Sequence, residues 1–292
     1  MKFLPARETR AAWLFVAPAA AGLLAFTLVP AVRGLFYSFT DFSVFRPGKF
    51  VGAGNYRQLA ADPVFWNALW VTLEYVVLNI GVQTVLALGV AVLMHRLTRS
   101  MVIRGLILTP YLVANVIVAL VWFWILDYQL GIGNQVLDWL GLPRMAFFGD
   151  QALAIPTIAL VNVWRHLGYT ALLIFAGLQT IPKTVYEAAA IDGATEAKMF
   201  WRVTLPLLRP VLALVLVVSV VGSFQTFDTV AVTTQGGPVN STRVIYYYIY
   251  ELAFGRFKFG YASAVSVVLF AVLAAVSLLQ LRLTRAGQSD LA

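Results

Sequence analysis

The chain has 292 residues, of which 61% are hydrophobic and only 12% are charged, and its mean hydropathy is +0.82. Soluble domains are about 45–50% apolar and about 25% charged, so this composition indicates an integral membrane protein and argues against a soluble one. The absence of cysteine excludes disulfides and thiolate metal sites, and the two histidines, His95 and His166, cannot build a zinc site by themselves.

Long apolar runs separated by polar, turn-rich stretches divide the chain into six expected membrane spans. A helix needs about 20 apolar residues to cross the hydrocarbon core, and each run reaches that length. The first run is too long for the core of a signal peptide, so we expect it to be retained. The expected spans are residues 11–37, 67–94, 105–126, 152–178, 207–232 and 262–283, within a single transmembrane domain of residues 1–292.

Positive charges are distributed unequally between the two sides of these spans. The richer side carries Lys2, Arg7, Arg10, Arg96, Arg99, Arg104, Lys183, Lys198, Arg202, Arg209, Arg282 and Arg285. The poorer side carries Arg46, Lys49, Arg57, Arg144, Arg243, Arg256 and Lys258. The positive-inside rule makes the richer side cytoplasmic, together with both termini. The net charge of +8 is therefore mainly a topology signal and does not indicate a nucleic-acid partner.

The most informative polar stretch, residues 179–206, lies between the fourth and fifth spans. The run from Lys183 to Ile191 consists mostly of good helix formers, and Gly193 suits the left-handed turn that closes a helix. Thr195 suits the N-cap of a second short helix, which we expect Pro206 to end. The pattern predicts two short helices joined by a glycine turn.

The spacing within this stretch resembles the EAA loop of ABC-importer permeases. Glu187-Ala188-Ala189 is followed after three residues by Gly193, and after nine more by Val203-x-Leu205-Pro206. The family usually has isoleucine where Val203 stands, and valine keeps the branched apolar shape. Segments on either side resemble the carbohydrate-uptake branch of that family. They are Trp164-Arg165-x-x-Gly168-Tyr169, then Thr234-Gln235-Gly236-Gly237-Pro238 with Ser241-Thr242.

This resemblance implies an all-α membrane protein of six transmembrane helices, with the type I ABC-importer permease fold and cytoplasmic EAA coupling helices. It is similar to permeases of the maltose and glycerol-3-phosphate type in the cell inner membrane. The resemblance implies that ATPase coupling involves Glu187, Ala188, Ala189, Asp192, Gly193, Val203, Leu205 and Pro206.

The same resemblance implies several partners besides the lipid bilayer. They are a second homologous permease subunit, two copies of a cytoplasmic ABC ATPase and an extracytoplasmic substrate-binding protein. The chain has no G-x-x-x-x-G-K-[ST] loop to cradle ATP phosphates, so we expect ATP and Mg to bind the ATPase. We therefore expect no enzymatic activity, no cofactor and no metal in this chain.

Polar side chains within the expected spans are candidates for a solute path, because such groups are costly in hydrocarbon. A carbohydrate site needs amides and acids for hydroxyl groups, and aromatic rings for apolar sugar faces. Hydrogen bonding between helices, typically worth less than about 2 kcal/mol, is the alternative. The candidate path residues are Asn79, Gln83, Asn115, Asn162, Phe224, Gln225, Phe227 and Asp228. For Arg165 we expect a structural partner such as a carboxylate.

Together these features predict the permease subunit of an ATP-driven, binding-protein-dependent importer of a sugar or sugar-like solute. Glycerol-3-phosphate, a glycerophosphodiester or an amino sugar is the alternative cargo of the same architecture. A secondary transporter or channel would need paired intramembrane acids or repeated halves, and the expected spans contain only Glu74 and Asp228 as acids. A membrane enzyme has less support, because no nucleophile–base constellation stands out.

Overall fold

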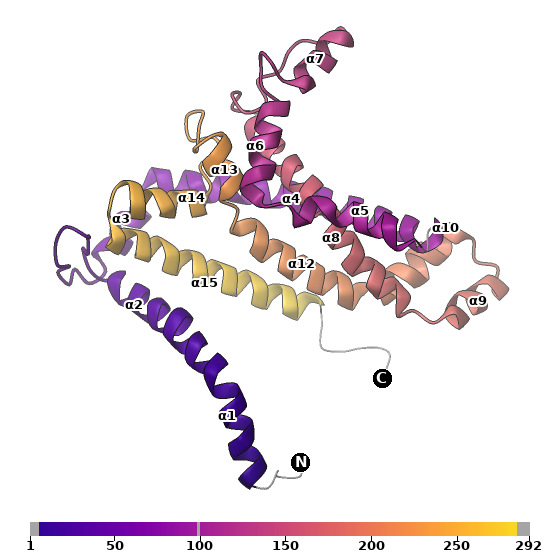
Figure 1. The fold of residues 1–292 in the computed structure, drawn as a ribbon, viewed down its shortest axis with the longest axis horizontal. Helices are drawn as coiled ribbons and strands as arrows, with labels where there is room; N and C mark the ends of the chain where they lie inside the picture. Colours follow the sequence, from indigo (N-terminus) through magenta and orange to yellow (C-terminus); the bar gives the residue numbers. More distant parts are fainter. Residues whose placement is uncertain (1–5, 98–99, 285–292) are drawn as a thin grey trace. The chain divides into compact units, whose positions relative to one another are not determined.

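The computed structural model describes residues 6–97 and 100–284. These residues are helical apart from their connecting loops and two isolated β-bridges, Thr40–Phe50 and Ser43–Arg46. The chain forms two compact units, one of residues 1–62 and 249–270 and the other of residues 63–248 and 271–292. Figure 1 labels the helices and colours them along the sequence, from indigo at the N-terminus to yellow at the C-terminus.

The first unit begins with a continuous helical segment formed by α1 (Ala6–Leu23), the π-helical turn η1 (Leu24–Leu28) and α2 (Val29–Tyr37). Its stretch Leu14–Tyr37 is long and apolar enough to cross a membrane, and none of it is buried within the chain. A polar loop and α3 (Gly54–Ala60) follow. The Asn55 amide closes this loop by donating to the carbonyl oxygens of Ser38 and Thr40, at 2.8 Å each.

Three further elements complete the C-terminal part of the chain: α14 (Ile245–Tyr250), the π-helical turn η3 (Glu251–Gly255) and α15 (Phe259–Thr284). Within the first unit, the Tyr261 hydroxyl at the start of α15 donates to the Asp62 carboxylate at 2.6 Å. Phe259–Gln280 is long and apolar enough to span a membrane.

The second unit is built around α4 (Pro63–Leu97), which packs along α8 (Ala154–Gln179) and against α12 (Arg209–Phe224) (Figure 1). Its core contains fully buried alanines, among them Ala87 and Ala171, beside larger apolar side chains such as Ile174. Small residues let membrane helices approach closely. At Gly168 the approach is so close that a Cβ would overlap the Ile107 carbonyl oxygen.

The third expected span, residues 105–126, is broken in the structure. It consists of α5 (Met101–Leu112) and α6 (Asn115–Ile125), which meet at an angle of 89°. Val113 and Ala114 take extended conformations with ψ of 138°, so the helical hydrogen bonding cannot continue through them. Pro110 already lacks one of the N–H groups that would hold the last turn of α5.

The fifth span has a break as well. The helix α12 ends at Phe224, and α13 (Asp228–Thr233) begins after three non-helical residues. A short helix, α7 (Ile132–Trp139), lies in the loop between α6 and α8. Among the described residues, five segments are long and apolar enough to span a membrane, and there are six if the bent α5–α6 pair is counted as one span.

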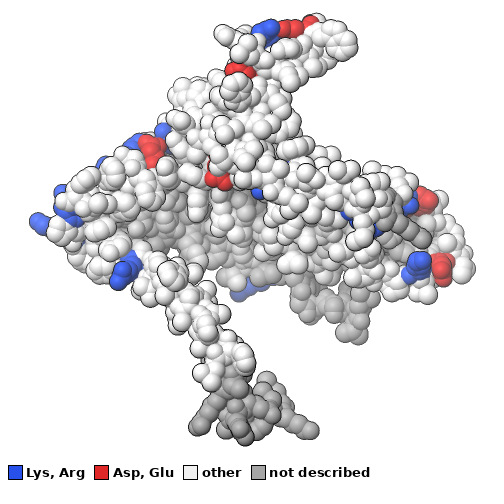
Figure 2. Space-filling view, viewed as in Figure 1, with Lys and Arg blue, Asp and Glu red and all other residues white. Residues whose placement is uncertain are grey.

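Charged side chains are sparse on the visible surface of the described residues, where they form small clusters separated by wide uncharged areas (Figure 2). Uncharged helix surfaces are the surfaces that lipid or another apolar partner can cover. The helical composition and these apolar segments together confirm the predicted all-α membrane class.

The stretch between the fourth and fifth spans folds as α9 (Lys183–Ile191), a turn, α10 (Glu196–Met199), the π-helical turn η2 (Phe200–Thr204) and α11 (Leu205–Leu207). The prediction that Pro206 ends the second helix is wrong. The chain stays helical through η2, and Pro206 lies in the first turn of α11, where a missing N–H is tolerated.

Candidate functional site

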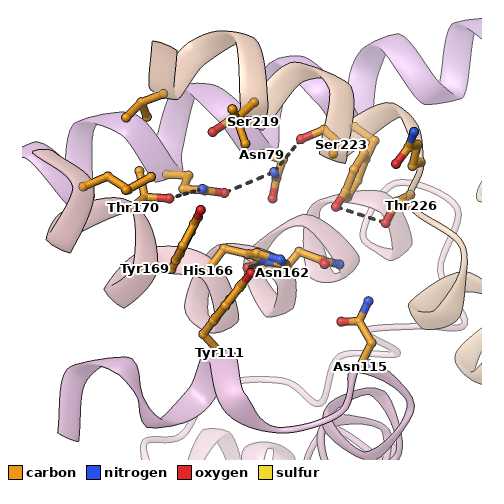
Figure 3. A pocket seen from close by; sticks show the side chains of 17 residues that line it. Asn79, Tyr111, Asn115, Asn162, His166, Tyr169, Thr170, Ser219, Ser223 and Thr226 are labelled. Atoms are coloured by element: carbon orange, nitrogen blue, oxygen red, sulfur yellow. Dashed lines mark hydrogen bonds between the residues drawn. The ribbon is translucent and has the colours of Figure 1, made fainter. Parts of the chain in front are cut away.

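A polar cavity of about 240 Å³ lies among α4, α5, α8 and α12 of the second unit (Figure 3). Ligand pockets typically measure roughly 300–1,000 Å³, so this cavity suits a small solute. Its amide side chains are Asn79, Gln83, Asn115, Asn162 and Gln225. Its hydroxyl groups belong to Tyr75, Tyr111, Tyr169, Thr170, Ser219, Ser223 and Thr226. The remaining lining residues are His166, Leu173, Val215, Val218 and Gly222.

A chain of side-chain hydrogen bonds joins three helices at one wall of this cavity. The Asn79 amide of α4 donates to Ser223 of α12 at 3.0 Å and to Gln83 at 3.3 Å. Gln83 in turn donates to the Thr170 hydroxyl of α8 at 2.7 Å. The Asn79 oxygen Oδ1 is buried and has no hydrogen-bond partner among the described residues. This wall therefore contains one acceptor that the described chain leaves unpaired.

Stacked aromatic rings form part of the opposite wall. Tyr111 of α5 and Tyr169 of α8 have ring centroids 4.5 Å apart and an angle of 11° between their planes. Figure 3 shows both tyrosines reaching toward the open space from below, opposite Asn79. Aromatic faces and hydroxyl groups side by side suit a ligand with one apolar face and several polar groups.

The structure brings five of the eight candidate path residues together in this cavity: Asn79, Gln83, Asn115, Asn162 and Gln225. The other three lie elsewhere. Phe224 is buried at the end of α12, and the Phe227 ring lies near the rings of Tyr246 and Tyr247, at 6.3 and 6.2 Å. Asp228 begins α13 and accepts a hydrogen bond from Asn115.

Sequence reasoning missed the hydroxyl-bearing residues and His166 as lining groups. A signal was available in the fourth span, where Asn162, His166 and Tyr169 recur at helical spacing and so share one face of α8. Ser219 and Ser223 have the same four-residue spacing on α12. A single tyrosine or serine in an apolar span does not indicate a site, and the cavity is defined only where α4, α5, α8 and α12 come together.

Arg165 supports the break between α5 and α6, and among the described residues it forms no hydrogen bond to the carboxylate that we expected. Its Nε and Nη2 donate to the Val113 carbonyl oxygen, and Nη2 also donates to that of Tyr111, at 3.2 Å each. The guanidinium also lies over the Tyr111 ring, 5.2 Å from its centroid. The last carbonyl groups of a helix lack intrahelical partners, and a cation at that end satisfies them.

The two broken spans meet at α6 and α13, which pack against each other. Asn115, the first residue of α6, donates to the carboxylate of Asp228, the first residue of α13, at 3.1 Å. The Asn162 amide of α8 donates to the Thr229 hydroxyl at 3.2 Å. Lining residues of the cavity therefore fix the positions of both breaks.

A second cavity, of about 440 Å³, lies at the far ends of α6 and α13. Its lining includes Phe123, Tyr128, Phe148 and the turn residues Gly237 and Pro238. Beside it, the backbone N–H groups of Leu130 and Gln129 donate to the Asp127 carboxylate and hold the pKa of that group below its usual range. These contacts order the loop that follows α6.

The turn between α9 and α10 has the predicted local geometry. Gly193 has a φ of +74°, and the N–H groups of Gly193 and Ala194 donate to the carbonyl oxygens of Ala190 and Ala189, as in a Schellman motif. The Thr195 hydroxyl accepts from the Lys198 N–H and caps α10. Both predictions are confirmed.

The outer side of this turn is exposed, whereas one inner side chain is anchored. Ile191 is 87% exposed at the tip of α9, and Glu187 is also exposed. Tyr186 packs against the core shared by α4, α8 and α12, and its hydroxyl accepts from Thr204 at 3.3 Å. An ion pair between Arg96 and Glu196 links α10 to the end of α4. The pair of short helices is therefore tied to the membrane helices and offers its tip outward.

The order of apolar helices, the polar cavity among them and the helical hairpin outside them define a membrane transport permease. The chain belongs to the family of binding-protein-dependent transport system inner membrane components, which matches residues 83–286. This confirms the resemblance inferred from the EAA spacing.

Curated relatives match along almost the whole chain. A sulfoquinovosyl glycerol transport system permease protein of Agrobacterium fabrum is 34% identical, over 93% of this chain and 89% of its own. A trehalose/maltose transport system permease protein of Thermococcus litoralis is 32% identical, and the match covers 96% of this chain and 95% of that protein. An sn-glycerol-3-phosphate transport system permease protein of Yersinia pestis is 33% identical, over 92% of each chain.

Solved structures show the same fold. A chain of a bacterial ABC transporter involved in the import of the acidic polysaccharide alginate has a TM-score of 0.83 at 24% identity, covering 96% of this chain and 97% of that one. A chain of the bacterial alginate ABC transporter in complex with an alginate pentasaccharide-bound periplasmic protein has a TM-score of 0.84 at 22% identity, covering 97% and 98%. The type I ABC-importer permease fold is thereby confirmed.

Proposed function

We propose that this chain is one of two permease subunits of an ATP-driven importer that carries a sugar or sugar-like solute. The observation that carries this proposal is the hydroxyl- and amide-lined cavity within the membrane helices of a chain from this family. The trehalose/maltose, sulfoquinovosyl glycerol and glycerol-3-phosphate permeases named above support a polyhydroxylated cargo.

The solute path runs through the cavity in this proposal. Amides and hydroxyls exchange hydrogen bonds with solute hydroxyl groups, and the stacked rings of Tyr111 and Tyr169 contact an apolar sugar face. The breaks in the third and fifth spans border the same cavity at Asn115 and Gln225. Because α6 and α13 lie beyond these breaks, movement of this helix pair changes access to the cavity.

The helical hairpin of residues 179–206 couples the chain to a cytoplasmic ATPase in this proposal. Exposed Ile191 supplies an apolar anchor, Glu187 supplies a charge at the rim, and Gly193 allows the reversal between the two helices. Tyr186 and the Arg96–Glu196 ion pair transmit a displacement of the hairpin to the membrane helices. The catalytic chemistry of ATP hydrolysis, with its Mg²⁺, belongs to that partner.

The proposal extends to the partners and the orientation of the chain. The complex contains a second homologous permease, two ATPase copies and an extracytoplasmic binding protein, with both termini of this chain in the cytoplasm. The solved alginate transporter bound to a periplasmic protein supports the binding-protein partner.

Uptake by the reconstituted complex in proteoliposomes tests this function. ATP enclosed with the ATPase, together with the binding protein on the opposite side, is expected to drive accumulation of the solute. Omission of either component removes uptake, and collapse of ion gradients leaves it unchanged. Uptake that follows an ion gradient and ignores ATP would favour a secondary transporter instead.

A further inference from the structure

We infer that the cavity accepts uncharged, hydroxyl-rich solutes and discriminates against anions such as uronates and sugar phosphates. The inference rests on the proposed function, because it names the class of solute that the same cavity takes. It depends on three observations: none of the described lining side chains is charged, the donors of the neighbouring cation are directed at the chain itself, and one buried acceptor has no partner among the described residues.

The first observation is the charge of the lining. None of the 17 described side chains that line the cavity belongs to lysine, arginine, aspartate or glutamate. An anion that leaves water for such a site loses its hydration and gains no opposite charge in return. A neutral polyol exchanges hydrogen bonds with water for hydrogen bonds with amides and hydroxyls. The charge of the lining therefore favours the neutral solute.

The second observation is that the nearby cation is committed to the backbone. Arg165 directs Nε and Nη2 at the carbonyl oxygens of Val113 and Tyr111. Its Nη1 lies 2.9 Å from Nε2 of His166, whose Nδ1 lies 3.0 Å from the Asn162 carbonyl oxygen. A carbonyl oxygen and a guanidinium N–H can both be satisfied only by a neutral imidazole that donates from Nδ1 and accepts at Nε2. The guanidinium keeps its positive charge, but these contacts direct its donors at the chain itself, and the neutral imidazole adds no charge to the lining.

The third observation is the unpartnered oxygen of Asn79. This side chain is 4% exposed, and its amide nitrogen already donates to both Ser223 and Gln83. Its Oδ1 is buried and has no hydrogen-bond partner among the described residues. Figure 3 shows the Asn79 oxygen directed at the open space above Asn162 and His166. A solute hydroxyl can donate to it, so this acceptor favours a hydroxyl-rich solute, and the uncharged lining is what disfavours an anionic group on that solute.

Sequence identity does not distinguish a neutral from an anionic solute. The trehalose/maltose permease and the glycerol-3-phosphate permease are 32% and 33% identical to this chain, although one of these solutes is neutral and the other is an anion. The composition of the cavity does separate them.

A matched pair of ligands tests the inference on the purified permease–ATPase complex without ATP. Methyl glucoside and methyl glucuronide differ only at C6, where a hydroxymethyl group is replaced by a carboxylate. Their binding is measured by saturation-transfer NMR at constant ionic strength. We expect the glucoside to bind at least about tenfold more tightly, which corresponds to about 1.4 kcal/mol. Equal or tighter binding of the glucuronide, or no binding of either, overturns the inference.

Variants of the lining provide the second readout. Asn79→Leu removes the acceptor and is expected to weaken glucoside binding about tenfold. Ser219→Lys places a cation in the cavity and is expected to shift the binding ratio toward the glucuronide. Thr109→Lys, on an exposed part of α5 that does not line the cavity, is the matched control and should leave the ratio unchanged. An unchanged ratio in Ser219→Lys contradicts a binding site in this cavity.

Uptake assays on the same preparation separate this inference from the proposed function. ATP-dependent uptake that persists while the wild-type complex binds the glucuronide equally well would overturn only the neutral-solute inference. A preserved preference for the glucoside without ATP-dependent uptake would overturn only the proposed function.

Discussion

Polar side chains inside the membrane helices have two different tasks in this chain. Arg165 donates hydrogen bonds to carbonyl groups that have no helical partner at the break in the third span, so its role is to support the backbone. Asn79 has satisfied donors and an acceptor that is unpaired among the described residues, and in the proposed function this acceptor contacts the solute. The distinction depends on the partners of each atom and cannot be read from residue type.

The Asn115–Asp228 hydrogen bond gives the first prediction. Asp228→Ala removes the acceptor that joins α6 to α13, whereas Asp228→Asn keeps an acceptor oxygen at the same length. A hydrogen bond to a charged group contributes about 1.5–3 kcal/mol. We expect uptake to fall about tenfold in Asp228→Ala and less in Asp228→Asn, with unchanged binding of the ATPase. Initial uptake rates, normalised to the amount of permease in the membrane, measure the effect of each variant. Wild-type uptake in Asp228→Ala would show that the hydrogen bond contributes to helix packing and not to transport.

Arg165 gives the second prediction. Arg165→Met leaves the carbonyl oxygens of Tyr111 and Val113 without their donor, at a cost on the order of 2 kcal/mol. Arg165→Lys keeps the charge but loses the planar fork that reaches both oxygens. We expect the thermal unfolding temperature of the purified complex to fall in the order wild type, lysine variant, methionine variant.

The apparent KM of uptake distinguishes a structural role of Arg165 from direct contact with the solute. Because Arg165 does not line the cavity, the residual uptake of Arg165→Lys should keep the wild-type apparent KM and lose maximal rate. A large rise in apparent KM at unchanged stability would place the guanidinium against the solute.

At the scale of elements, local chemistry predicted some features well and missed others. The glycine turn at Gly193 and the cap at Thr195 follow from properties of single residues, and the structure has both. The break at Val113–Ala114 was missed, because those two residues are apolar and hydropathy averages over a whole span. Pro206 was misjudged because the π-helical turn before it changes the register of the backbone hydrogen bonds.

The hairpin gives the third prediction. No described atom lies within 4 Å of a Cβ added at Gly193, so among the described residues Gly193→Ala meets only the strain of a positive φ, on the order of 1 kcal/mol. Gly193→Asp adds the same strain, a charge and bulk that a docked ATPase must accommodate. Glu187→Lys reverses a charge on the exposed face of α9. Uptake is expected to be lost in Gly193→Asp and Glu187→Lys and largely kept in Gly193→Ala.

Co-purification of the ATPase with each variant, at equal permease levels, separates docking from folding. The proposed coupling role requires that the two disruptive variants retain the ATPase weakly, or retain it without stimulation of ATP hydrolysis by the binding protein. Wild-type uptake and wild-type ATPase association in both would remove the basis for the EAA assignment.

At the scale of the whole molecule, the membrane class followed from composition and the family from the EAA spacing, whereas the cavity did not follow from either. Its wall combines Asn79, Gln83, Thr170 and Ser223, which come from three helices and meet only after those helices pack. A linear sequence shows which residues are polar. It does not show which of them face one another. It also does not show that Arg165 supports the helix break at Val113, 52 positions earlier in the chain.

The topology gives the last prediction, which concerns the chain as a whole. The unequal distribution of lysine and arginine predicts that both termini and the hairpin lie in the cytoplasm, because basic segments are retained on that side. Reporter fusions after Arg99 and Ala286, both outside the described residues, should give cytoplasmic signals. Fusions after Lys49 and Gly237 should give extracytoplasmic signals. Green fluorescent protein, which is active inside, and alkaline phosphatase, which is active outside, provide opposite readouts at each site. The reporter signals alternate between the two sides only if the bent α5–α6 pair crosses the membrane once. A reversed signal at any two sites would therefore contradict the six-span arrangement.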